Sequence, residues 1–186
     1  MRTAVLAMLV TLAMTATVAQ PDLVAGVSVT DTVRFEAQVF LLNGVAVYSK
    51  FGVQVLAAGL WLDHREPDAA RILDSDRPRR YVSHFLRRVG AKRIRDAWMK
   101  GLAANSPGAT AEVREQFRTL CSWTRDFQRG EEIIVTYIPE RGSLVEVGGA
   151  RKGILTGKGF ADAYFACAIG PKPGLGEKFK RRLLGS

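Results

Sequence analysis

The chain has 186 residues, of which 47% are hydrophobic and 24% charged, and its formal net charge is +9. This length suits one domain, and this composition excludes both an intrinsically disordered chain and a multi-spanning membrane protein. Two cysteines and two histidines are too few for a disulfide-stapled scaffold or a histidine-rich metal site. We therefore expect a single basic, globular domain.

The first 19 residues have the pattern of an export signal. Arg2 precedes an uncharged, apolar run over residues 3–18, which ends in the small residues that a signal peptidase recognises. A retained membrane anchor is the alternative, but the run is shorter than the ~20 residues that a helix needs to cross a bilayer. The sequence predicts a signal peptide over residues 1–19, one domain over residues 20–186, and an exported, periplasmic protein.

The first part of the domain has the alternating pattern of strands. Asn43-Gly44 predicts a hairpin turn, because both residues tolerate positive φ. Gly59, inside a long apolar strand, predicts a bulge or the close approach of another backbone. The strands expected here cover residues 27–30, 33–35, 39–42, 46–48 and 51–62.

The middle and the end of the chain combine helices with further strands. Apolar residues at helical spacing and flanking Gly or Pro residues predict the helices, and a three-stranded meander follows the third of them. The helices are expected at 67–73, 91–104, 111–123, 160–169 and 176–184, and the strands at 81–86, 133–138, 143–147 and 151–155. This order is not a βαβ alternation. It predicts an α+β fold in which helices cover one side of an antiparallel sheet.

Basic residues form short clusters along the chain. Such clusters favour anionic partners, and export makes nucleic acid an unsuitable one, so an anionic membrane surface or an anionic small molecule is the expected partner. A solvated face that keeps the protein soluble is the alternative. The clusters comprise Arg77 with Arg79 and Arg80, Arg87 with Arg88, Lys92 with Arg93 and Arg95, and residues 180–182.

The common catalytic signatures do not occur. The sequence has no G-x-S-x-G, no Walker-type loop, no H-E-x-x-H and no C-x-x-C, so neither a metal nor a cofactor is expected. His84 is interpreted as a satisfied sheet residue rather than a catalytic base. Cys121 and Cys167 either form a disulfide after export or stay as two buried thiols, and neither has the neighbours that activate a nucleophile.

Several segments together resemble the chalcone isomerase-like family, in its small exported bacterial branch. Each segment is short, but their order and spacing are specific, and they span the domain from about residue 26 to residue 184. The segments are residues 26–29, 42–55, 57–62, 84–87, 130–133, 157–163 and 169–173.

The resemblance implies an open-faced β-sandwich with a ligand cleft between a large antiparallel sheet and its helices. Plant enzymes of the family close a flavanone ring with an arginine, a threonine and a tyrosine, and fatty-acid-binding relatives hold a carboxylate with an arginine and a tyrosine. The family's arginine aligns with Tyr48, and the hydroxyl residue of the next strand aligns with Leu56. The family's tyrosine and asparagine find no match over residues 92–95 and 99–100.

These departures favour binding over catalysis. Tyr48 has no fixed positive charge and Leu56 has no hydroxyl, and one lost oxyanion donor costs ~2.7–4 kcal/mol. No catalytic residue is therefore assigned. We expect a non-catalytic protein that holds an apolar or fatty-acid-like ligand. An isomerase of the family type and a basic, envelope-associated interaction module are the alternatives.

The expected cleft is apolar with few polar groups, as ligand pockets are. Arg87 is the cation expected to meet an anionic head group. Ordinary core packing is the alternative role for each aromatic residue. The predicted binding residues are Tyr48, Leu56, Arg87, Trp98 and Tyr164, with Phe40, Leu60 and Phe165 as further lining.

Overall fold

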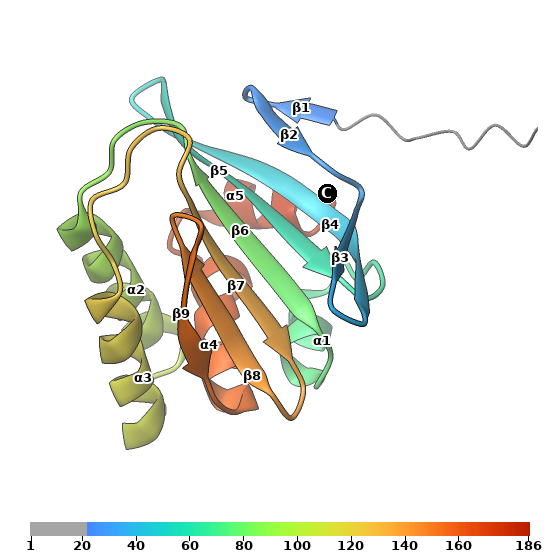
Figure 1. Cartoon of the computed structure of the whole chain (residues 1–186), viewed down its shortest axis with the longest axis vertical. Coiled ribbons are helices and arrows are strands. Elements are labelled where there is room, and N and C mark those ends of the chain that lie inside the picture. Colours follow the sequence, from blue (N-terminus) through green and yellow to red (C-terminus); the bar gives the residue numbers. More distant parts are fainter. Residues whose placement is uncertain (1–21) are drawn as a thin grey trace, which may run out of the picture.

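A computed structural model describes residues 22–186, so the predicted signal peptide lies outside the described part of the chain. Its framework is a seven-stranded antiparallel sheet in which every strand pairs with the next one along the chain (Figure 1). A separate two-stranded hairpin, β1 (Asp22–Val24) and β2 (Val27–Val29), precedes it. The seven strands are β3 (Thr32–Phe35), β4 (Gln38–Lys50), β5 (Val53–Leu62), β6 (Arg79–Phe85), β7 (Glu132–Ile138), β8 (Gly142–Val147) and β9 (Ala150–Leu155).

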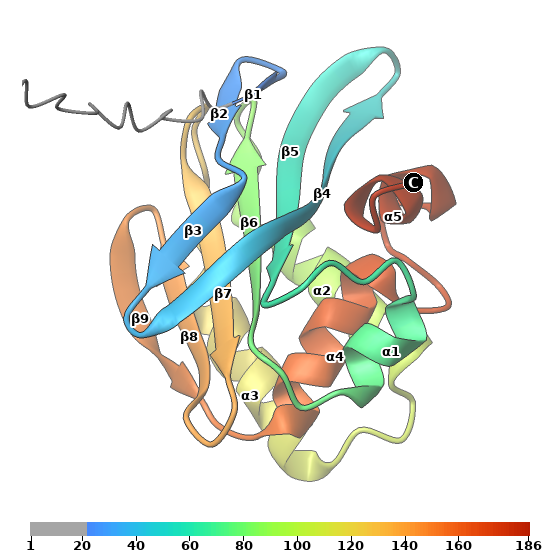
Figure 2. The same ribbon diagram turned by 90° about the vertical axis from the view of Figure 1, so that its right-hand side faces the viewer.

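Helices cover one face of this sheet, as Figure 2 shows. Capping side chains fix the starts of two of them: Asp68 accepts from the backbone N–H of Ala70, and Thr110 accepts from that of Val113. The α+β fold expected from the sequence is confirmed. The helices are α1 (Ala69–Asp74), α2 (Ala91–Asn105), α3 (Ala111–Ser122), α4 (Lys158–Ile169) and α5 (Glu177–Leu183).

The hairpin predicted at Asn43-Gly44 is wrong. β4 runs through both residues, with a register shift between Leu42 and Gly44. The Asn43 side chain donates to the Leu183 carbonyl at 3.0 Å, and a Cβ at Gly44 would lie 2.2 Å from the Arg182 carbonyl oxygen. The pair therefore makes a bulge against which α5 packs, a tertiary role that a dipeptide pattern does not reveal.

The chain instead turns at Phe51 and Gly52, whose φ angles are 52° and 77°. The second glycine prediction also needs correction. Gly59 pairs in register with Val45 and Val82, so it is not a bulge. A Cβ there would lie 2.3 Å from the Trp61 ring, so a side chain, not another backbone, requires the glycine.

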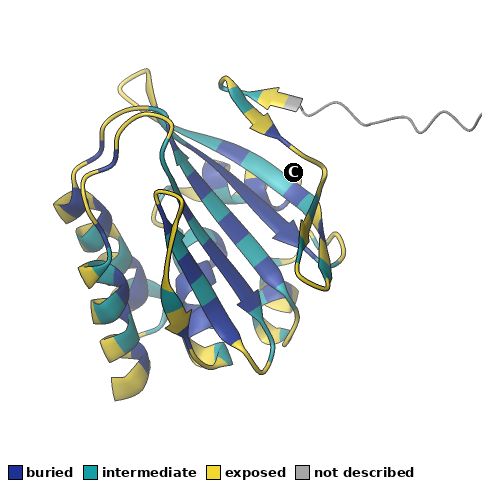
Figure 3. Ribbon diagram, in the orientation of Figure 1, coloured by how far each residue is buried: buried dark blue, intermediate teal, exposed yellow. Residues whose placement is uncertain are grey.

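The sheet face opposite the helices holds a small second core. Phe40 and Trp61 are buried there with Val29 of the β1–β2 hairpin, and the Trp61 indole N–H donates to the Thr30 carbonyl at 2.9 Å. The first hairpin thus covers part of the open face. Around it, the burial pattern of Figure 3 alternates along the strands.

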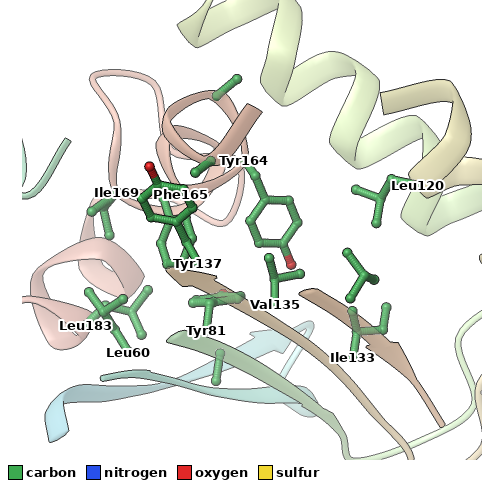
Figure 4. Close-up of a cluster of buried hydrophobic side chains, with 14 of the residues drawn as sticks. Leu60, Tyr81, Leu120, Ile133, Val135, Tyr137, Tyr164, Phe165, Ile169 and Leu183 are labelled. Carbon is green, nitrogen blue, oxygen red and sulfur yellow. The ribbon is translucent and has the colours of Figure 1, made fainter. Parts of the chain in front are cut away.

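The main core lies between the sheet and α4, where Tyr81, Val135 and Phe165 meet (Figure 4). α4 is buried around most of its circumference, which accounts for its strongly apolar sequence. Within residues 22–186, no helix is both long and apolar enough to cross a membrane.

One member of a predicted basic cluster, Arg79, does not lie on the surface. The Arg79 side chain is only 1% exposed and forms an ion pair with Asp162, while one Nη donates to the Ile72 carbonyl at 2.8 Å. Its guanidinium lies over the rings of Tyr137 and Phe165. Arg79 is thus a core residue, because inner-face and outer-face positions alternate along β6 and place it under the helices.

Candidate ligand-binding site

A cavity of about 170 Å³ lies between the sheet, α2, α4 and the loop that joins α4 to α5. Most of its wall is apolar or aromatic, as in sites for small organic ligands. The apolar contributors include Val55, Leu56, Phe85, Ile94, Trp98 and Phe165. The polar contributors are Tyr48, Tyr81, Ser83, Arg93, Tyr164 and Cys167.

Strand register places a small side chain, Ser83, between larger ones at the cavity wall. On the face toward the helices, Ala58 pairs with Ala46 on one side and with Ser83 on the other. Tyr81 and Phe85 stand two residues away from Ser83 on the same strand and face, since side chains alternate along a strand. A row of three small side chains therefore crosses the sheet between larger ones, and Ser83 forms part of the cavity wall.

Two tyrosines place hydroxyl groups at the cavity. The rings of Tyr81 and Tyr164 meet edge to face, with centroids 6.2 Å apart. Burial raises the pKa of Tyr164 well above its ordinary value, and it also raises that of Tyr81, against a smaller opposing effect of the Ser83 hydroxyl. Both phenols therefore stay protonated at neutral pH and can offer a hydrogen bond to a ligand.

The two cysteines are free thiols, so the structure does not contain the disulfide alternative. Cys167 contacts the Ala163 carbonyl oxygen at 3.3 Å, and burial raises the pKa of its thiol to about 12. Burial also raises the pKa of Cys121. Protonated thiols are poor nucleophiles, so Cys167 contributes bulk and polarisability to the wall rather than reactivity.

The cation at the cavity is Arg93, not Arg87. Arg93, in the first turn of α2, is exposed and borders the cavity. Within residues 22–186, no hydrogen bond or ion pair of its guanidinium is found. Arg87 is exposed in the loop between β6 and α2 and does not contribute to the wall.

Four of the five predicted binding residues border this one cavity: Tyr48, Leu56, Trp98 and Tyr164. Of the further lining residues, Phe165 also borders it. Phe40 belongs instead to the small core on the opposite face of the sheet, and Leu60 is fully buried in the main core. Both were misplaced because the bulge at Asn43 and the position of α5 cannot be deduced from apolar alternation.

Three residues of the cavity wall were not predicted from the sequence: Arg93, Tyr81 and Ser83. Arg93 could have been found, because it lies one helical turn before Ala97, which is adjacent to Trp98, and Trp98 was already assigned to the cleft. Tyr81 and Ser83 alternate with outward residues of the same strand, but nothing in the sequence says which of the two sets faces a cavity.

His84 lies on the opposite face of the sheet, away from the cavity. Its Nδ1 lies 2.9 Å from a carboxylate oxygen of Glu132 on the neighbouring strand. It is a paired sheet residue, as expected. Among the described residues, no group of three His, Cys, Asp or Glu side chains converges in the manner of a metal site.

Comparison with known proteins supports the same fold. The crystal structure of a fatty-acid binding protein from Arabidopsis thaliana superimposes with a TM-score of 0.64, at 15% sequence identity, covering 86% of this chain and 92% of that one. A search of functionally characterised proteins finds no match. The family model described as chalcone isomerase-like matches residues 21–185. Since that match spans the described domain, the chain belongs to the chalcone isomerase-like family.

Proposed function

We propose that this protein is a non-catalytic binder of a small apolar molecule with an anionic end, such as a fatty acid. The observation that carries the proposal is the apolar cavity whose rim bears the exposed Arg93. The fold likeness to a fatty-acid binding protein is consistent with it. An apolar group would lie against Leu56 and Trp98 in the cavity, while its carboxylate stayed near Arg93 in water, which avoids the cost of burying a charge.

The cavity volume limits what is enclosed. At about 170 Å³ it is close to the ~150 Å³ engineered cavity that holds benzene, and it is smaller than the ~300–1,000 Å³ of typical ligand pockets. One aromatic ring or a short acyl segment fits, and the rest of a longer ligand would extend through the mouth. The expected ligand is therefore a medium-chain acid or a single-ring acid.

An isomerase of the family type is the second candidate, and Arg93 is the observation that favours it. A guanidinium at the rim could stabilise a phenolate, as the family's own arginine does. The resemblance itself weighs against this function, because it aligns Tyr48 and Leu56 with positions where the family's enzymes have a charge and a hydroxyl.

The first test is native mass spectrometry of the protein as purified from cells, followed by titration with octanoate and with the neutral octanol. Trp98 borders the cavity, so a ligand should change tryptophan fluorescence. Arg93→Ala should weaken octanoate binding about two- to five-fold, the range of an exposed ion pair, and leave octanol binding unchanged. Arg87→Ala is the matched control and should change neither.

Two outcomes would contradict the proposal: consistently bare protein that ignores both probes, or an equal loss for acid and alcohol in Arg93→Ala. The isomerase is tested separately by following chalcone absorbance. A rate above the spontaneous background that disappears in Arg93→Ala would establish the second candidate instead.

A further inference from the structure

An exposed aromatic residue, Phe51, lies in the turn between β4 and β5. Phe51 is 94% exposed, and Val53 beside it is 47% exposed. The backbone of Phe51 is in the left-handed region, with φ 52°, a conformation that bulky side chains rarely adopt. Neither packing nor turn geometry therefore accounts for a phenylalanine here, and such outliers are grounds for seeking a function.

The same end of the molecule carries an excess of positive charge. The β4–β5 turn, the loop between β6 and α2, and the loop between α3 and β7 all lie at the upper end in Figures 1 and 2. The two loops are bound to each other by paired backbone hydrogen bonds between Val89 and Phe127. The backbone N–H of Leu86 donates to the Val55 carbonyl oxygen at 3.0 Å. This hydrogen bond joins the two loops to the base of the β4–β5 hairpin.

Two acidic side chains at this end already form ion pairs with basic ones. Asp126 pairs with Arg88 at 3.0 Å and Glu131 pairs with Arg125 at 2.6 Å. Four further cations here are exposed and, within residues 22–186, have no carboxylate partner within ion-pair distance. They are Lys50, Arg87, Arg93 and Arg129. Lys50 lies 5.5 Å from the Phe51 ring centre, so a cation stands beside the exposed aromatic residue.

We infer that this end is a docking surface for an anionic lipid bilayer, with Phe51 entering the interface and the four cations facing lipid head groups. We call it the hairpin end. Amphipathic surfaces bind membranes through apolar burial combined with attraction of basic residues to anionic lipid. A compact protein partner would need a larger apolar patch. One projecting aromatic ring flanked by cations instead matches the surface of an anionic bilayer, where charged head groups lie above apolar acyl chains.

The hairpin end also borders the cavity. Tyr48 and Val55, near the base of the hairpin, Val89, and Arg93 all belong to the cavity wall. A docked molecule would hold the cavity mouth at the membrane surface, where acyl ligands are found. The export predicted from the first 19 residues would bring the protein to such a surface. The docking itself does not depend on the proposed ligand and is tested without one.

The experiment is co-sedimentation of the full chain with vesicles of phosphatidylcholine alone and of phosphatidylcholine with an equal part of phosphatidylglycerol. We expect binding only to the anionic vesicles, weakening as salt rises. Phe51→Ser should reduce binding about ten-fold, from the loss of one buried aromatic side chain. Arg87→Glu with Arg129→Glu should reduce it by at least about twenty-five-fold, at about five-fold per cation.

The matched control is Arg65→Glu with Arg71→Glu, which makes the same charge change at the other end of β5. Both control residues are exposed, and the control variant should lose much less binding. All variants keep the same first 21 residues, so any contribution of that segment cancels in the comparison. A Phe51→Trp variant should show a blue-shifted emission with anionic vesicles.

Three results would overturn the inference. They are binding that ignores lipid charge, wild-type binding by Phe51→Ser, and equal losses in the two charge-reversal variants. Since no cavity ligand is present in these measurements, their failure would leave the proposed ligand binding standing. Conversely, bare protein that still binds anionic vesicles would contradict only the ligand.

Discussion

The helix-covered face of the sheet has two halves with opposite packing. Toward the β4–β5 turn, Tyr48, Leu56 and Ser83 line a cavity over the sheet. Toward the other end of the same strands, Leu62 and Arg79 stand side by side in the ladder. Both are buried under the helices, and a second, more polar cavity of about 160 Å³ borders them. We call these the cavity half and the filled half.

In the filled half, a charged side chain, Arg79, is part of the core. The Arg79 guanidinium forms an ion pair with Asp162 and lies over the rings of Tyr137 and Phe165. The Lys158 ammonium, 2.7 Å from the second Asp162 oxygen, completes the network. The same sheet face therefore carries a fully buried charged side chain at one end and an apolar cavity at the other. Stability should reside mainly in the first half and binding in the second.

The largest expected effect is in the filled half. Arg79→Ala should lower the free energy of unfolding by about 3 kcal/mol, because removing one partner of a buried pair leaves the other uncompensated and opens a void. Denaturant unfolding measures this. Arg77→Ala, two residues away, is the control. Arg77 is exposed and pairs with Asp63 at 2.7 Å, so its loss should cost at most about 1 kcal/mol. Equal costs would contradict the buried role of Arg79.

Two inner-face serines allow a matched test of the two halves. Ser83→Leu should fill the cavity and weaken binding of octanoate and octanol alike by at least about ten-fold, with little loss of stability. Ser143 is fully buried in the filled half, paired with Tyr137 and Leu155. Ser143→Leu should overpack that half and cost about 1–3 kcal/mol of unfolding free energy. If Ser143→Leu abolishes octanoate binding in the folded protein and Ser83→Leu does not, binding does not reside in the cavity half.

Acid should loosen the loops beside the cavity half. A side-chain hydrogen bond from Arg125 and a backbone one from Gln128 lower the pKa of Glu131 from 4.5 to about 2. Because the folded pKa lies below the unfolded one, this stabilising contribution is fully present above pH 4.5 and is lost as the pH falls toward 2. The loops that Glu131 fixes should therefore loosen over that window.

Amide hydrogen exchange measures this smaller effect. Relative to intrinsic rates, the Val89 and Phe127 amides should lose protection at about pH 3 compared with about pH 6. The amide of Tyr137, in the filled half, should keep its protection. Glu131→Gln should already have loosened loops at the higher pH. Uniform loss across both halves would mean global acid unfolding instead.

Much of this molecule could be predicted from local sequence. The helix faces, the final meander and the α+β class follow from apolar periodicity, which depends only on residues a few positions apart. The resemblance to the chalcone isomerase-like family led to the same fold and to Tyr48 and Leu56, and the apolar helix patterns led to Trp98 and Tyr164; all four border the cavity. These residues could be found because each lies in an element with a strong pattern of its own.

What only the tertiary structure decided depends on contacts between distant segments. The bulge at Asn43 exists because α5, about 140 residues later, packs on it. Arg79 is core rather than surface because α4 supplies Asp162. The cavity exists because residues from the sheet, α2, α4 and the loop after α4 meet around it. Register and packing are set by the balance of all contacts at once, and no local pattern encodes them.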